Sequence, residues 1–266
     1  MSLFSSRRHA HCVLNEAISP FVTQYSELGA LKSWFFELNS HLGENIRLSL
    51  LVPFDQAPKM ARNAKKHFRL FFFERGLAVK PLSFPLAGIF LPFPENSIQF
   101  GLYRVTVEKT EFDEGDWDRR VSAILLEALA KEEIDDETVF SLCLYLHLTL
   151  KREFLCLCPA NESLFKEFYE TSDSIAGTPS VLTVWQEKLE DNKAVLKEIC
   201  TDISDSTFYE RQNWLSRWAT LCAEAIRHED SENQITRLVF LINKQLGVSA
   251  SQFEVVRYFV LSSWHL

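Results

Sequence analysis

The segment Ser33–Val52, SWFFELNSHLGENIRLSLLV, constrains the fold more than any other part of the chain. Two strand-like runs flank the residues HLGEN, which are of the types that form turns. In the second run apolar positions alternate with polar ones, with Ile46, Leu48 and Leu50 set against Arg47 and Ser49. A period of two is typical of a strand with one buried and one solvated face. The segment therefore predicts a β-hairpin that carries Arg47 on its polar face.

The other patterns before residue 112 are two helices and one strand. Residues 12–32 and 57–75 show helical spacing. Pro20 predicts a kink in the first helix, and Gly76 is placed where a C-terminal cap would end the second. Residues 97–112 are β-branched and alternating, which predicts a further strand.

Every pattern after residue 112 is helical. The predicted fold class is therefore α+β, with a small mixed or antiparallel sheet and helices in residues 1–112 and a mostly helical part in residues 113–266. We expect the two parts to share one core. The predicted helices of the second part cover about 116–132, 136–152, 160–170, 179–201, 207–228, 232–246 and 250–263.

The composition indicates a globular protein, which we expect to be cytoplasmic and to have reduced cysteines. Hydrophobic residues make up 47% and charged residues 24% of the 266 positions. The net charge of −8 argues against nucleic-acid binding as the main function. No signal peptide or run of about 18 apolar residues is present, so we expect no membrane span. The basic segment Lys59–Arg69 departs from this acidic trend, either as a solvated helix face or as a contact for an acidic partner.

The cysteines do not have the spacing of a metal site. Of six, only Cys156 and Cys158 are close in sequence, and zinc sites use wider spacing and a second pair. No phosphate-binding glycine loop or Ser/His/Asp order is present either. We therefore expect no metal and no cofactor, and cysteines that serve as core residues.

Three segments agree, in order, with one known pattern. Trp34, Phe35, Phe36, Ile46, Arg47 and Leu48 match W-F-F-x-R-Y-x-D-P-x-x-H-[IL]-R-[LV]-R without a gap. Tyr103, Glu108 and the basic Lys109 match a later strand, and Asn243, Lys244 and Gly247 match a late helix. In these residues the chain resembles the thiopeptide-type bacteriocin biosynthesis domain. That domain is also the C-terminal, glutamate-elimination domain of lantibiotic dehydratases.

The resemblance implies a protein that modifies ribosomally synthesised peptides. Fused members eliminate glutamate from glutamyl-Ser or glutamyl-Thr, whereas some free-standing relatives join two dehydroalanines into a pyridine ring and release the leader peptide. The length of this chain fits the free-standing arrangement. The implied partners are a precursor peptide and a separately encoded dehydratase (glutamylation) subunit, and a homodimer stays open. The implied substrate-binding residues are Tyr103, Glu108, Asn243 and Lys244, with Arg47 as a catalytic residue.

The sequence departs from the family at other positions that carry its chemistry. Leu38 and Ser49 replace two arginines, and Val239 and Leu241 replace the histidines of the late helix. Elimination needs a base and cationic donors that bind the leaving glutamate. The side chains at these four positions provide neither a base nor a cation.

Three candidate substitutes for the missing catalytic groups lie in or beside the hairpin turn, namely Glu37, His41 and Glu44. The alternative for Glu44 is a surface ion pair with Arg47. His147 is expected to be a core or interface histidine rather than a catalytic one. We also expect Arg47→Ala to spare the fold and to reduce peptide modification or binding.

Three classes of function follow. The first is a lyase or cyclase acting on a peptide, with rearranged catalytic residues. The second is a non-catalytic subunit that binds the peptide or a partner beside the hairpin, by adding a strand or lying along the sheet. The third is an unrelated α+β interaction protein.

Overall fold

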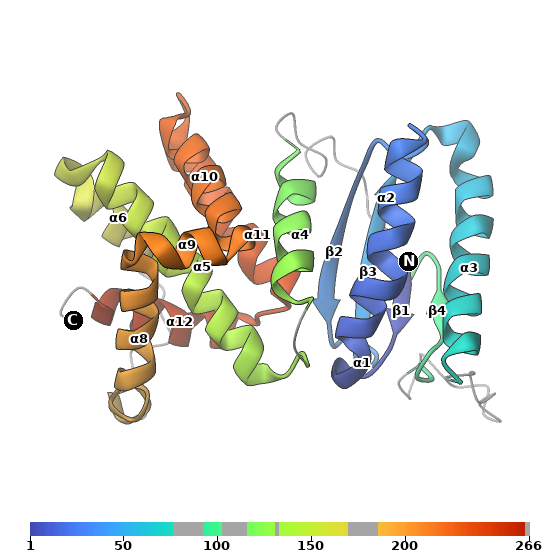
Figure 1. Cartoon of the computed structure of the whole chain (residues 1–266), viewed down its shortest axis with the longest axis horizontal. Coiled ribbons are helices and arrows are strands. Elements are labelled where there is room, and N and C mark those ends of the chain that lie inside the picture. Colours follow the sequence, from blue (N-terminus) through green and yellow to red (C-terminus); the bar gives the residue numbers. More distant parts are fainter. Residues whose placement is uncertain (77–92, 103–115, 131–132, 170–185, 264–266) are drawn as a thin grey trace. The chain divides into compact units, whose positions relative to one another are not determined.

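The chain forms two compact units in a computed structural model that describes residues 1–76, 93–102, 116–130, 133–169 and 186–263 (Figure 1). The first unit comprises Met1–Thr138 together with Gln245–Gly247, and the second comprises Val139–Lys244 and Val248–Leu266. The predicted boundary at residue 112 lies outside the described residues.

A four-stranded sheet with the order β2-β3-β1-β4 forms the centre of the first unit. Its strands are β1 (Ser2–Phe4), β2 (Ser33–Asn39), β3 (Asn45–Leu51) and β4 (Ile98–Gln99), and all neighbours pair antiparallel. The α+β class and the β2–β3 hairpin are confirmed. Strand β1 was not predicted, because three residues are too few to show a period of two. Only the beginning of the predicted strand 97–112 is described, and it forms β4.

The first predicted helix is divided into three helical segments. It begins as α1 (Arg7–Cys12), continues as a π-helical segment (Val13–Ile18) and ends as α2 (Ser19–Glu27). Pro20 lies in the first turn of α2. Proline has no backbone N–H to donate, and the first turn of a helix is where this lack is best tolerated. The departure from α geometry therefore lies next to the residue that predicted a kink.

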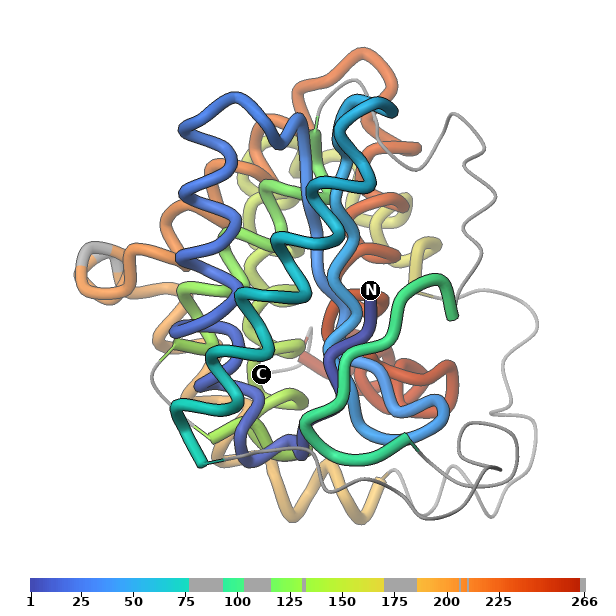
Figure 2. Tube along the Cα trace, turned by 90° about the vertical axis from the view of Figure 1, so that its right-hand side faces the viewer, coloured from blue at the N-terminus to red at the C-terminus, as the bar shows by residue number. Residues whose placement is uncertain are grey.

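The second predicted helix is confirmed as α3 (Ala57–Glu74), and Gly76 follows it with a positive φ of 67°. Figures 1 and 2 show α1, α2 and α3 on one side of the sheet. Phe21 of α2 and Phe68 of α3 pack together there with ring centroids 5.4 Å apart. Both side chains are fully buried, so the two helices share an aromatic core over the sheet.

The two faces of the sheet differ in chemistry because side chains alternate along each strand. One face carries an apolar row, in which Leu3 lies opposite Ile46 and Leu48 opposite Phe36. These four side chains are at most 1% exposed, and we assign this face to the side covered by the helices. The other face carries Arg47 and its neighbours.

Helix α4 (Trp117–Ala128) covers the outer edge of β2 (Figure 1). The Phe36 N–H at this edge donates to Ser122 Oγ at 3.1 Å. Ser122 Oγ then donates to Gln245 Oε1 at 2.8 Å, and Gln245 Nε2 donates to the Asp118 carbonyl at 2.9 Å. This chain of bonds satisfies an edge N–H that would otherwise need solvent or another strand.

The described part of the second unit is helical. The predicted helix 207–228 is divided into α9 and α10, with Gln212 between them in a non-helical conformation. Within the described ranges, no helix is long and apolar enough to cross a bilayer. The helices are α5 (Asp136–Leu157), α6 (Glu162–Tyr169), α8 (Lys193–Ser204), α9 (Ser206–Arg211), α10 (Asn213–Arg227), α11 (Ser231–Leu246) and α12 (Ala250–Ser262).

Gly247 should tolerate no side chain. Its φ is +67°, and a Cβ there would lie 2.2 Å from the Leu38 carbonyl oxygen of β2. Gly29 and Gly76 have similar φ values of +64° and +67° with open space around them, so they are matched controls. We expect Gly29→Ala and Gly76→Ala to cost roughly 1 kcal/mol each, and Gly247→Ala at least about 2 kcal/mol more, in urea unfolding. Equal losses at the three positions would contradict this packing of Gly247 against β2.

Candidate functional site

A polar row crosses all four strands of the sheet. Glu37 of β2 lies opposite Arg47 of β3, Arg47 lies opposite Ser2 of β1, and Ser2 lies opposite Gln99 of β4. Directly opposed residues in antiparallel strands point to the same face, so the four side chains share it. We call this surface, with its neighbours Asn45 and Ser97, the polar face.

The centre of the polar face is an ion pair between Arg47 and Glu37. Arg47 Nη1 lies 3.2 Å from Glu37 Oε2, and the two side chains are only 19% and 4% exposed. Arg47 is therefore not a charge on a solvated hairpin face, as the alternation alone would suggest. Its positive charge is offset by a buried carboxylate, which also limits the orientation of the guanidinium.

The amine of Met1 lies close to this pair. It donates to the Leu48 carbonyl at 2.8 Å. The pKa of this amine is lowered to about 6, mainly by burial and also by the positive charge of Arg47, whereas Glu37 acts in the opposite direction. The polar face thus gathers two basic groups and one carboxylate in a weakly solvated place.

Several buried polar atoms on or next to this face have no hydrogen-bond partner among the described residues. They include Ser2 Oγ, Asn45 Oδ1 and Ser97 Oγ. Asn45 uses its amide N–H groups to bind the carbonyls of His41 and Gly43 at 3.2 and 2.8 Å, which fixes its side chain at the hairpin turn. Buried polar groups normally find partners, so these atoms are a cost to the fold that the described residues do not offset.

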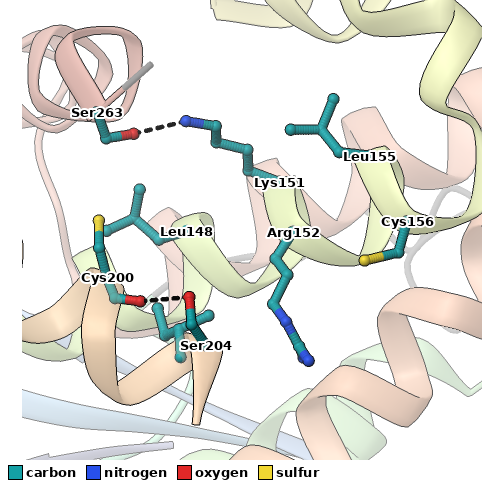
Figure 3. A pocket seen from close by; sticks show the side chains of 9 residues that line it. Leu148, Lys151, Arg152, Leu155, Cys156, Cys200, Ser204 and Ser263 are labelled. Carbon is teal, nitrogen blue, oxygen red and sulfur yellow. Dashed lines mark hydrogen bonds between the residues drawn. The ribbon is translucent and has the colours of Figure 1, made fainter. Parts of the chain in front are cut away.

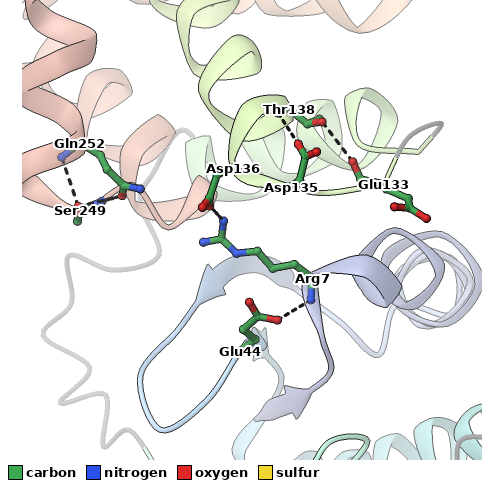
Figure 4. A network of polar contacts seen from close by, with 8 residues as sticks. All are labelled: Arg7, Glu44, Glu133, Asp135, Asp136, Thr138, Ser249 and Gln252. Carbon is green, nitrogen blue, oxygen red and sulfur yellow. Dashed lines mark hydrogen bonds and ion pairs between the residues drawn. The ribbon is translucent and has the colours of Figure 1, made fainter. Parts of the chain in front are cut away.

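The two turn residues proposed as catalytic substitutes have other contacts. His41 is exposed, and its N–H donates to Asn39 Oδ1 at 2.7 Å. Glu44 Oε2 accepts the Arg7 N–H at 2.8 Å, and the Arg7 side chain pairs with Asp136 (Figure 4). The expected ion pair between Glu44 and Arg47 is therefore wrong, because Glu37 provides the carboxylate. Sequence reasoning missed Glu37 as the partner, although the hairpin register could have indicated it.

The four predicted substrate-binding residues are distributed over separate parts of the chain. Tyr103 and Glu108 lie outside the described residues. Asn243 is in the second unit, where its Nδ2 donates to the Val239 carbonyl at 2.7 Å and its Oδ1 accepts from Cys143 Sγ at 3.7 Å. Lys244 places its ammonium 5.6 Å from the centre of the Phe240 ring. The binding roles of these residues remain predictions.

His147 is a core residue of the second unit, as predicted. It is fully buried, and its Nδ1 lies 2.8 Å from the Tyr169 hydroxyl. Burial lowers its pKa to about 4, although the Asn243 side chain partly opposes the shift. The imidazole is therefore neutral at physiological pH and contributes to packing and hydrogen bonding.

A separate pocket of about 310 Å³ lies among helices of the second unit (Figure 3). Lys151 Nζ donates to Ser263 Oγ at 2.8 Å at this pocket, and burial lowers the pKa of Lys151 to about 8. No motif in the sequence indicated the pocket, because it forms between α5, α8 and the end of α12. Its other lining residues are Leu148, Arg152, Leu155, Cys156, Cys200, Ile203 and Ser204.

The described residues contain no group of three or more His, Cys, Asp or Glu side chains that could hold a metal ion. The groups of the polar face can form hydrogen bonds, stabilise charge through a compensated arginine and position a bound chain.

Comparison with known proteins shows a shared fold. The solved structure of the pyridine synthase TbtD, from thiomuracin biosynthesis, matches with a TM-score of 0.61 over 98% of this chain and 96% of that chain. The sequence identity is 12%, so the likeness shows the fold alone. No protein-family model and no curated protein matches the chain. The chain thus has the fold of an enzyme from thiopeptide biosynthesis.

A double-mutant cycle should detect coupling between Glu37 and Arg47. Arg47→Met leaves the Glu37 carboxylate buried without its cation, so we expect a loss of about 3 kcal/mol in the free energy of unfolding. Adding Glu37→Gln removes the uncompensated charge, and the double variant should recover roughly 2 kcal/mol of that loss. Urea unfolding of the four proteins at neutral pH measures both values. Additive losses would show that the two side chains are not energetically paired.

Acid should destabilise the second unit through His147. The unfolded chain binds a proton at this residue as the pH falls through about 6.5, whereas the folded chain resists protonation down to about 4. Stability from this group is therefore complete above pH 6.5 and is lost towards pH 4, by about 3 kcal/mol. Urea unfolding of His147→Gln across this range should show a shallower dependence than the parent. The parent protein, unfolded under the same conditions at each pH, is the reference.

Proposed function

We propose that this protein acts in the maturation of a ribosomally synthesised peptide, as a protein of the cyclisation type. Two observations support this class together. The fold agrees with that of a pyridine synthase over nearly the whole of both chains. Independently, the sequence resembles the thiopeptide-type biosynthesis domain at Trp34–Phe36 and Ile46–Leu48 of the hairpin.

In this proposal the polar face is where the substrate peptide lies. A peptide backbone presents alternating N–H and C=O groups, and the polar face offers the partly exposed polar side chains of Arg47 and Gln99. Arg47 would hold a peptide carbonyl or stabilise negative charge that develops on it.

The ion pair between Arg47 and Glu37 is the observation that favours cyclisation over elimination of glutamate. Elimination of glutamate requires cations that can bind the carboxylates of the leaving group. Arg47 shares its charge with a buried carboxylate 3.2 Å away, which disfavours a second carboxylate beside it.

The replaced family positions agree with this choice. Leu38 is 6% exposed and lies on the apolar row opposite Ile46, on the other face from Arg47. Leu241 of α11 is also buried, at 1%. Neither position provides a cation or a proton-transfer group. Joining two dehydroalanines into one ring depends mainly on holding the reacting atoms about 3–3.5 Å apart.

The proposed partners follow from this substrate. Dehydroalanines must be installed before a cyclisation, so a separately encoded dehydratase (glutamylation) subunit would act first on the same precursor peptide. A second candidate function is a non-catalytic subunit that binds the precursor. The ion pair of Glu37 with Arg47 favours this binding function, because a carboxylate held in an ion pair is a poor proton acceptor.

Mass spectrometry of a precursor peptide that carries two dehydroalanines tests the proposal. We expect the leader to be released and a smaller cyclised product to appear only when this protein is present. The double variant Arg47→Met/Glu37→Gln should reduce conversion at least about 10-fold, because one charge-assisted contact is worth roughly 1.5–3 kcal/mol. The matched control Glu187→Gln/Lys188→Met neutralises two exposed charges and should keep full conversion.

The possible outcomes separate the two functions. Binding of the peptide without any mass change would make the protein a binding subunit. Loss of glutamate from a glutamylated peptide would contradict the cyclisation type and indicate elimination. Absence of both binding and conversion would contradict the whole proposal.

A further inference from the structure

The outer face of α3 combines positive charge with exposed apolar side chains. Lys59, Arg62, Lys66, Arg69 and Phe73 recur at spacings of three and four residues, so they form one stripe along the helix. Leu70 lies beside this stripe, and all six side chains are exposed. We call these six residues the α3 stripe.

The α3 stripe differs from an ordinary solvated helix face in two ways. Leu70 and Phe73 are 51% and 73% exposed, which leaves an apolar pair in water at the end of a cationic row. The cations Lys59, Arg62, Lys66 and Arg69 also form no ion pair with the described residues, whereas Arg75 at the end of the helix pairs with Glu16. The stripe therefore offers both exposed apolar area and positive charge that no carboxylate of the described residues offsets.

The opposite face of α3 fixes the stripe in place. Met60, Ala64, Phe68, Phe71 and Phe72 are all buried. Figure 1 shows α3 at the outer side of the first unit, beyond β4. The stripe is therefore a preformed surface, and a ligand would not have to reorder the helix before binding.

We propose that the α3 stripe is a docking surface for an acidic, amphipathic peptide segment. Carboxylates of such a segment match the four cations, and its apolar side chains match Leu70 and Phe73. The whole chain carries a net charge of −8, which disfavours a long polyanion such as nucleic acid. Two exposed apolar side chains give little area for insertion into a lipid surface. A short peptide with few negative charges therefore suits the stripe best.

Fluorescence anisotropy with the full chain tests this proposal. The probe is a fluorescein-labelled synthetic peptide with Glu and Leu at helical spacing, and a peptide with Lys in place of Glu is the control. We expect binding of the acidic peptide alone, weakening as salt rises because screening acts within about 10 Å at 0.1 M. The triple variant Arg62→Glu/Lys66→Glu/Arg69→Glu should bind roughly 10- to 100-fold more weakly.

A second charge-reversal variant separates local from overall charge. Lys188→Glu/Lys197→Glu/Arg227→Glu makes the same change in net charge at exposed positions of the second unit, and it should retain the parent affinity. Leu70→Ser/Phe73→Ser should weaken binding roughly 10-fold and leave the salt dependence unchanged. Circular dichroism confirms that the variants are folded, which is expected for substitutions at exposed positions.

Three results would overturn the proposal. These are no binding of the acidic peptide, an equal loss in the second-unit variant, or tighter binding of duplex DNA or phosphatidylserine vesicles that the α3 variant abolishes. The assay measures docking alone and involves no chemistry on the peptide. Failure of the conversion assay and failure of this docking surface are therefore distinguishable.

Discussion

The register of the β2–β3 hairpin, in which Glu37 lies directly opposite Arg47, is the constraint on which the first unit depends. A shift by one residue would move Phe36 and Leu48 to the polar face and bring Glu37 and Arg47 against the helices. Both displacements are costly, since an apolar row would face a polar environment and two charges would enter an apolar core. The ion pair and the apolar row therefore specify the same register from opposite faces of the sheet.

The same register explains why a single arginine can sit in a weakly solvated sheet. Its charge is matched by Glu37 of β2 at 3.2 Å, and its neighbour on the other side, on β1, is the small side chain of Ser2. The outer edge of β2 is closed by Ser122 and Gln245, so the hairpin does not present a free edge there. The polar face, rather than this edge of the sheet, is thus the surface available for a peptide in our proposal.

Local patterns predicted the elements, whereas long-range pairing determined the site. The alternation around Arg47 predicted β3, and the helical spacing with Gly76 predicted α3. Neither pattern could reveal β1, because only its pairing with β3 identifies these three residues as a strand.

The environment of Arg47 was predicted less well than its location. An alternating strand does not indicate whether its polar side faces solvent, so Arg47 was expected to be exposed and Glu44 to be its partner. The buried Glu37 changes that expectation, and Arg47→Ala, which was expected to spare the fold, should now destabilise it. Burial of a charge is decided by the whole fold, and the sequence around Arg47 carries little information about it.

Site-specific photocrosslinking tests most directly whether the polar face holds the substrate peptide. A benzophenone side chain would replace Ser49 or Gln99, which belong to the polar side of the sheet, or the exposed Gln24 of α2 as a control. Our account predicts crosslinks to the dehydroalanine-containing precursor from positions 49 and 99 and none from position 24. Crosslinks from position 24 alone, or equal yields at the three positions, would contradict it.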